Sequence, residues 1–189
     1  MNYKNFATNK TTLNQQDLCN NMETFSALES FEKEFKFKGP VLDVGSGSKP
    51  LALKKWCDDR KLDYTPFDHN GDDEYVIQGD MHHLKEIFTN KFNTIFCINA
   101  LEHAISPAVA LIEMNRVLEK DGLLVIGLPI GKGHDITDEH YINLTENQFI
   151  NLRNHFGFEF VKTIRFSNIH FYFVRKVEDW DKDSYLKGC

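Results

Sequence analysis

Residues 41–50, VLDVGSGSKP, are the stretch that most constrains how this chain can fold. The apolar run at its start predicts a short buried strand, and the two glycines after it predict a tight turn. Pro50 suits the first turn of a helix, where its missing N–H costs nothing. A strand that turns straight into a helix is typical of a parallel sheet covered by helices.

The rest of the chain continues this alternation. Apolar and β-rich runs predict strands at residues 63–67, 75–78, 92–99, 123–128, 158–165 and 170–177. Periodic apolar residues and capping signals predict helices at residues 13–35, 50–60, 83–88, 106–120 and 145–156, with Gly122 placed to end the fourth. Residues 166–169 leave no room for a crossover helix, so the last two strands should pair antiparallel. We therefore expect an α/β fold with a seven-stranded, mostly parallel sheet, helices on both faces and an antiparallel terminal hairpin.

Composition excludes several classes of function. The chain has 189 residues, a net charge of −6 and no long basic run, which argues against nucleic acid as a partner. Its four cysteines are far apart and form no CxxC pair, so neither a zinc site nor a disulfide framework is indicated. No apolar run is long enough to span a bilayer, and no signal segment is seen, so we expect a cytoplasmic protein with no membrane partner.

The glycine turn alone leaves two kinds of ligand open. The dinucleotide fingerprint G-x-G-x-x-G needs a third glycine so that helix and strand pack closely under the pyrophosphate. Here Gly45 and Gly47 are present, but Pro50 stands at the third position. The missing glycine and the terminal hairpin both disfavour a nicotinamide dehydrogenase, and the segments further along the chain decide between the alternatives.

Four segments in order resemble those of class I S-adenosylmethionine-dependent methyltransferases. They are VLDVGSGSKP, YTPFD, QGDMHHL and FCINALEH, and the resemblance covers about residues 39–177. RVLEKDGLLVIGLP and DEHYINLTENQF further resemble the subgroup that acts on small molecules. Ser48 departs from the family, which often has a third glycine there. The resemblance implies a Rossmann-like sheet with S-adenosylmethionine as the cofactor.

The resemblance also implies which residues bind the cofactor, all of them at carboxyl ends of strands. Around the methionine part it places Asp43, Gly45, Ser46 and Gly47. At the ribose it places Asp68, an ionised acceptor for two hydroxyls, with His69 beside it. At adenine it places Asp80 and Met81, and near the amino group and the transferred methyl it places Asn99 and Ala100.

Three histidines are candidate general bases for a hydroxyl acceptor: His103, next to the expected methyl-transfer site, and His134 and His140, in the loop after the fifth strand. A structural role for His103 is an equal alternative. His82 and His83 are interpreted as helix-start residues. The acids of the same loop favour a solvated surface over a metal site, so no metal is expected.

The expected function is methyl transfer from S-adenosylmethionine to a small-molecule or sugar-like acceptor. A non-catalytic S-adenosylmethionine-binding module and a methyltransferase acting on a macromolecule remain as alternatives. Residues 1–38 are expected to form an N-terminal helical cap or lid, and residues 39–189 the methyltransferase domain. The pattern predicts neither the identity of the acceptor nor the oligomeric state.

Overall fold

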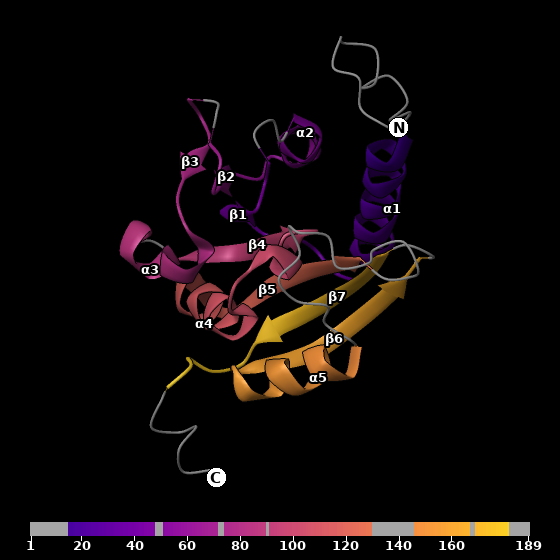
Figure 1. The fold of residues 1–189 in the computed structure, drawn as a ribbon. Helices are drawn as coiled ribbons and strands as arrows, with labels where there is room; N and C mark the ends of the chain where they lie inside the picture. Colours follow the sequence, from indigo (N-terminus) through magenta and orange to yellow (C-terminus); the bar gives the residue numbers. More distant parts are fainter. Residues whose placement is uncertain are drawn as a thin grey trace.

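The computed structural model describes residues 15–47, 51–71, 74–89, 91–129, 146–166 and 169–181. Its strands are β1 (Val41–Val44), β2 (Tyr64–Asp68), β3 (Ile77–Gln78), β4 (Phe92–Ile98), β5 (Leu118–Pro129), β6 (Phe158–Arg165) and β7 (Ile169–Lys176). Its α-helices are α1 (Gln15–Glu32), α2 (Leu51–Asp59), α3 (Leu84–Ile87), α4 (Pro107–Val117) and α5 (Glu146–His155), and two 3₁₀ turns are η2 (Met81–His83) and η3 (Leu101–His103). Figure 1 labels the strands and α-helices along the ribbon.

The strands form one seven-stranded sheet in the order β3-β2-β1-β4-β5-β7-β6. Neighbouring strands from β3 to β5 run parallel, whereas β7 runs antiparallel to both β5 and β6. The α/β fold and the antiparallel terminal hairpin are therefore confirmed. The hairpin reaches the sheet through its second strand, so β6 forms the edge, a placement that the sequence pattern did not specify.

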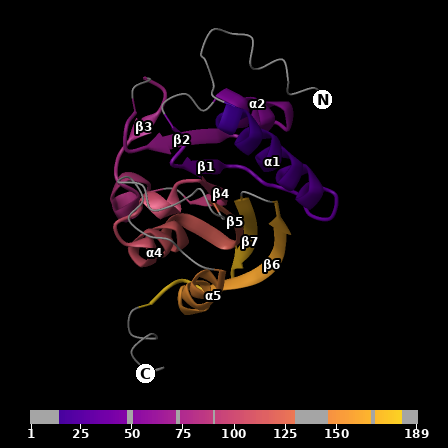
Figure 2. The ribbon, with the colours of Figure 1, turned by 45° about the vertical axis from the view of Figure 1, so that its right-hand side comes forward.

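Each face of the sheet carries its own hydrophobic core. On one face α1 and α2 cover an aromatic cluster in which the ring of Phe31 stacks on that of Phe173, with centroids 4.1 Å apart. On the other face α3, α4 and α5 cover the apolar side chains of β4, β5 and β7. Figure 2 shows α1 and α5 on opposite sides of the sheet. No helix within the described part of the chain is both long and apolar enough to cross a membrane.

The fourth long helix ends earlier than the sequence predicts, and Gly122 does not end it. The helix α4 stops at Val117, and Leu118 already pairs with Phe92 of β4. The register of β4 and β5 then shifts, and Asp121 adopts a φ of 62° just before Gly122. A Cβ at Gly122 would lie 2.8 Å from the Glu119 carbonyl oxygen. Gly122 therefore serves a tight turn inside β5.

Two buried polar side chains hold the end of α4, and we call them the Asn115–Lys176 hub. The Lys176 ammonium donates to the carbonyl oxygens of Asn115 (2.7 Å) and Leu118 (2.8 Å). The Asn115 amide donates to the carbonyls of Phe156 and Glu178, and its oxygen accepts from the Trp180 N–H. The ends of α4, α5 and β7 are thus joined at the edge where β4 and β5 begin.

Smaller differences concern the third strand and the turn after it. β3 contains two residues, where four were expected at 75–78. The helix expected at 83–88 is the 3₁₀ turn η2 followed by one turn of α-helix, α3. Asp80 caps η2 with its side chain, which accepts a hydrogen bond from the His82 N–H. The expected helix starts at Pro50 and Thr145 lie outside the described residues.

Candidate functional site

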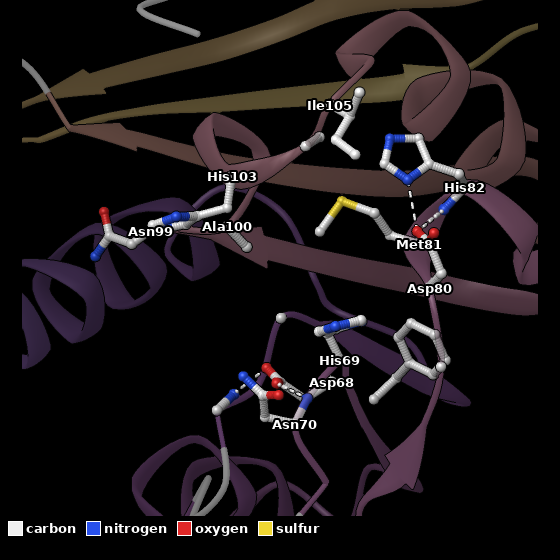
Figure 3. A pocket seen from close by; sticks show the side chains of 15 residues that line it. Asp68, His69, Asn70, Asp80, Met81, His82, Asn99, Ala100, His103 and Ile105 are labelled. Carbon is white, nitrogen blue, oxygen red and sulfur yellow. Dashed lines mark hydrogen bonds and ion pairs between the residues drawn. The ribbon is translucent and has the colours of Figure 1, made fainter. Parts of the chain in front are cut away.

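A cavity of about 680 Å³ opens at the carboxyl ends of β1, β2 and β4. Its walls come from the loop after β1, the turn after β2, the segment 79–82 and the segment 99–105 (Figure 3). The lining residues are Gly45, Gly47, Phe67, Asp68, His69, Asn70, Gly79, Asp80, Met81, His82, Asn99, Ala100, His103, Ala104 and Ile105. The volume lies within the range of roughly 300–1,000 Å³ that small-molecule sites occupy.

The turn after β1 forms the floor of the cavity. The N–H groups of Gly45 and Ser46 both donate to the Phe67 carbonyl, which fixes the turn to the end of β2. Gly45 has a φ of +78°, and a Cβ there would lie 2.3 Å from the Cβ of Ala100. Gly47 has a φ of +72°, and the position of its absent Cβ has no atom within 4 Å. Glycine is therefore required at the first position by crowding, and at both by backbone conformation.

Asp68, the last residue of β2, lies at the centre of the cavity wall. Its Oδ2 accepts from the Gly47 N–H at 2.8 Å, and its Oδ1 accepts from the Asn70 N–H at 2.8 Å. Two backbone donors on opposite oxygens hold the carboxylate in one orientation (Figure 3). Each carboxylate oxygen has further lone pairs, so the group can still accept hydrogen bonds from a ligand.

Asp80 and His82 form a second polar group in the cavity wall. Asp80 Oδ1 accepts from the His82 N–H at 2.9 Å and lies 2.5 Å from His82 Nδ1. His82 Nε2 in turn accepts from the Ser106 N–H at 3.2 Å. Burial raises the pKa of Asp80, but the hydrogen bonds from the His82 backbone and ring outweigh it and lower the pKa overall. The carboxylate is therefore held ionised.

The segment after β4 completes the cavity. Asn99 adopts a φ of 51° and donates its N–H to the Gly127 carbonyl, which turns the chain sharply at the strand end. Ala100 is buried against Gly45, while His103 is exposed and lines the cavity. Beside His103, burial raises the pKa of the Glu102 carboxyl to about 7. A histidine and a partly neutral carboxyl are therefore adjacent in the turn η3.

Asp43 lies under the cavity and not in its wall. Along β1, alternation places its side chain on the α1 and α2 face, where it is 4% exposed and accepts a hydrogen bond of 2.5 Å from the Tyr64 hydroxyl. Burial raises the pKa of Asp43 to about 7, and the nearby Asp68 adds to the shift, while the hydrogen bond from Tyr64 opposes it. This carboxyl supports the loop from beneath.

The structure brings most of the expected ligand-binding residues together. Eight of them line the cavity: Gly45, Gly47, Asp68, His69, Asp80, Met81, Asn99 and Ala100. Two do not: Asp43 is buried, and Ser46 donates its hydroxyl to the Gly47 carbonyl. Of the expected bases, His103 lines the cavity, while His134 and His140 lie outside the described residues.

Sequence reasoning missed six residues of the cavity wall: Phe67, Asn70, Gly79, His82, Ala104 and Ile105. Phe67 and Ile105 are apolar, and nothing in their surroundings in the sequence separates them from core residues. His82 was interpreted as a helix-start residue, yet its ring joins two walls of the cavity. The spacing Asp80-x-His82 was a usable signal, because an aspartate that caps a turn lies within reach of the second residue after it.

The segment that carries the cavity is similar to a known protein family. A family model described as a methyltransferase domain matches residues 42–126. That segment contains every residue of the cavity lining that the structure describes. A search of curated protein sequences found no match.

Solved structures with this fold share little sequence with the chain. A SAM-dependent methyltransferase from Archaeoglobus fulgidus is 14% identical with a TM-score of 0.64, covering 82% of this chain and 94% of its own. The 1,6-didemethyltoxoflavin-N1-methyltransferase of Burkholderia thailandensis, solved with 1,6-didemethyltoxoflavin and S-adenosylhomocysteine, is 13% identical with a TM-score of 0.65, covering 89% and 92%. The cyclase SpnF is 15% identical with a TM-score of 0.65, covering 90% and 85%.

Proposed function

We propose that this chain is an S-adenosylmethionine-dependent methyltransferase that transfers the sulfonium methyl group to a small-molecule or sugar-like acceptor, which the match of residues 42–126 to a methyltransferase domain and the fold support. The observation that carries the proposal is the composition of the cavity. The cavity presents an oriented carboxylate, Asp68, beside a glycine turn, a second carboxylate, Asp80, and a histidine, His103. The two carboxylates can accept hydrogen bonds from the ribose hydroxyls and the adenine amine of one elongated ligand. The histidine can take a proton at the reacting end of that ligand.

The residues present fit S-adenosylmethionine. The position where Gly47 lacks a Cβ is open space, so a ligand can approach the backbone there. Asp68 is held by two backbone donors and offers its remaining lone pairs to the two ribose hydroxyls. Asp80 accepts from the exocyclic amine of adenine, and the half-buried Met81 packs on the ring. Asn99 and Ala100 border the methionine end.

When bound, S-adenosylmethionine supplies a methyl group that its positive sulfur already activates for displacement. The protein's contribution is then alignment of the two reactants and exclusion of water. Gly45 packs closely against Ala100, and this rigid floor of the cavity helps to align the two reactants. His103 serves as general base, because it lines the cavity next to Ala100 and accepts the proton of a hydroxyl acceptor.

The acceptor is proposed to be small because the cavity has the volume of a small-molecule site and bears apolar as well as polar groups. The side chain of Ile105 lines it and is 73% exposed, which offers an apolar surface to a second molecule. The solved structures with this fold include an enzyme with bound 1,6-didemethyltoxoflavin and the glycopeptide N-methyltransferase MtfA. Because MtfA is a glycopeptide N-methyltransferase, a peptide acceptor remains the alternative.

Calorimetric titration with S-adenosylmethionine, S-adenosylhomocysteine and nicotinamide dinucleotides tests the proposal. Binding of the two adenosyl-sulfur ligands alone supports it and justifies a screen of acceptors by release of S-adenosylhomocysteine. Binding of a dinucleotide, or of none of these ligands, contradicts it. Tight binding with no turnover across a broad screen favours the non-catalytic module.

The role of His103 is tested separately once an acceptor is found. The variant His103→Ala should lose turnover by roughly 10²-fold or more while its affinity for S-adenosylhomocysteine stays within about twofold. His155→Ala is a suitable control, because His155 is exposed at the end of α5, outside the cavity lining. Full turnover in His103→Ala would assign the residue a structural role.

The cap formed by residues 1–38 also stays a proposal. Phe25, Leu28 and Phe31 of α1 are buried in the core, so a truncation to residue 35 would remove core side chains as well. Deleting residues 1–14 leaves those three side chains in place. Weaker acceptor affinity with unchanged stability in this truncated protein supports a cap, whereas unchanged affinity and turnover exclude one in residues 1–14.

A further inference from the structure

The side chain of His82 connects two walls of the cavity. It is 15% exposed and belongs to the turn η2. Nδ1 lies 2.5 Å from Asp80 Oδ1, and Nε2 lies 3.2 Å from the backbone nitrogen of Ser106. Figure 3 shows the ring between Asp80 and the segment that carries Ile105.

The two contacts determine where the ring carries its proton. Ser106 contributes a backbone N–H, which can only donate, so Nε2 must present its lone pair. A neutral histidine with an unprotonated Nε2 carries its proton on Nδ1. That proton then lies between Nδ1 and the Asp80 carboxylate and is donated to Oδ1. The backbone of Ser106 therefore selects the tautomer that orients Asp80.

This arrangement uses one oxygen of Asp80 and spares the other. Both the ring and the backbone N–H of His82 donate to Oδ1. Within the described part of the chain, Oδ2 accepts no hydrogen bond from another residue. Asp80 is half exposed, and without its two donors the carboxylate would rotate between rotamers.

We propose that His82 is a positioning residue for adenine: its Nδ1–H fixes the Asp80 carboxylate so that Oδ2 meets the exocyclic amine, and its Nε2 holds the Ser106 backbone at the opposite wall. This inference rests on the proposed function, since it assigns adenine to Asp80. The inference adds a residue that acts on adenine through Asp80. It also predicts that recognition of adenine and the position of residues 105–106 both depend on the side chain of His82.

The neighbouring His83 provides a matched control. It has the same side chain in the same turn, but it is 59% exposed and its Nδ1 lies 3.4 Å from Glu86 Oε1. It does not line the cavity. A change that follows from losing any histidine near the cavity would appear in His83→Ala as well.

The test compares S-adenosylhomocysteine with S-inosylhomocysteine, in which an oxo group replaces the adenine amine. Wild-type protein should prefer the first ligand, because Oδ2 of Asp80 accepts from an amine and repels an oxo group. His82→Asn keeps an N–H near the Nδ1 position and should keep the preference. His82→Gln places its amide near the Nε2 position, and it should lose the preference by at least about fivefold, as should His82→Ala.

The outcomes separate this inference from the proposed function. An unchanged preference in His82→Gln and His82→Ala overturns the inference alone. Wild-type protein that binds neither ligand overturns the proposed function and the inference with it. Ring nitrogen chemical shifts of ¹⁵N-labelled wild-type protein provide a check that needs no variant: a protonated Nδ1 with an unprotonated Nε2 is expected, and the reverse assignment overturns the inference.

Discussion

The two ends of the central strands differ in how their polar groups are hydrogen-bonded. At the carboxyl ends, the turns after β1 and β4 use positive φ values at Gly45, Gly47 and Asn99 and present polar groups to a cavity. At the amino end of β5, the Asn115–Lys176 hub satisfies carbonyl and N–H groups with buried side chains. One sheet therefore separates binding from stability. At one edge its polar groups can still bond to a ligand, whereas at the other edge they bond to one another and stabilise the fold.

The largest expected effect comes from removing the hub. Asn115→Ala eliminates three hydrogen bonds to the backbone, from groups that are buried or partly buried. We expect the free energy of unfolding to fall by about 3–5 kcal/mol, measured by urea denaturation, because unpaired buried groups keep their desolvation cost. The folded fraction should bind S-adenosylhomocysteine as the wild type does. Asn151→Ala, at an exposed position on α5, is the control.

A substitution in the floor of the cavity should lower both the stability of the protein and its affinity for the ligand. Gly45→Ala adds a methyl group 2.3 Å from Ala100 Cβ at a φ of +78°. We expect a loss of stability of about 2–4 kcal/mol and a loss of ligand affinity of at least roughly tenfold, because the floor of the cavity must shift. Gly47→Ala has the same backbone strain without the clash and should cost less stability. Equal stability losses would show that crowding against Ala100 is unimportant.

Removing a carboxylate from the wall should affect binding more than stability. Asp68→Ala should weaken binding of S-adenosylhomocysteine by about 1.5–3 kcal/mol, the scale for hydrogen bonds to a charged group. Calorimetry measures the difference directly. Asp58→Ala removes an exposed acid that pairs with Lys54 across one helical turn, so the affinity of this variant should match the wild type. Unchanged affinity in Asp68→Ala would remove Asp68 from the proposed ribose site.

The smallest expected effect concerns the carboxyl beneath the cavity. The pKa of Asp43 rises from its ordinary value of 3.8 to about 7 on burial. The native state therefore holds this proton more tightly than the unfolded chain, so stability falls as pH rises from about 4 to about 7 and then levels off. Asp43→Asn should remove roughly 1–2 kcal/mol of the decrease between pH 6 and pH 8, measured by chemical denaturation. An unchanged pH dependence would contradict this.

Local signals in the sequence predicted most elements, and the family resemblance predicted most of the cavity. A strand at β1 was predicted because an apolar run ends at a glycine turn, and eight of the ten ligand residues that the resemblance implied line one cavity. The failures have distant causes. The end of α4 is set by Lys176, which is 61 positions from Asn115. His82 acquires its role from Ser106, 24 positions away, and no local pattern shows that contact.

The hub also has a consequence for the order in which the chain is made. The described residues that line the cavity all precede Asn115, whereas the ammonium that serves the Asn115 carbonyl comes 61 residues later. At roughly 5–20 residues per second of synthesis, several seconds separate α4 from Lys176. During that time the edge of β5 that later pairs with β7 is open on the nascent chain. The described residues of the cavity are thus synthesised several seconds before the strand that covers this edge.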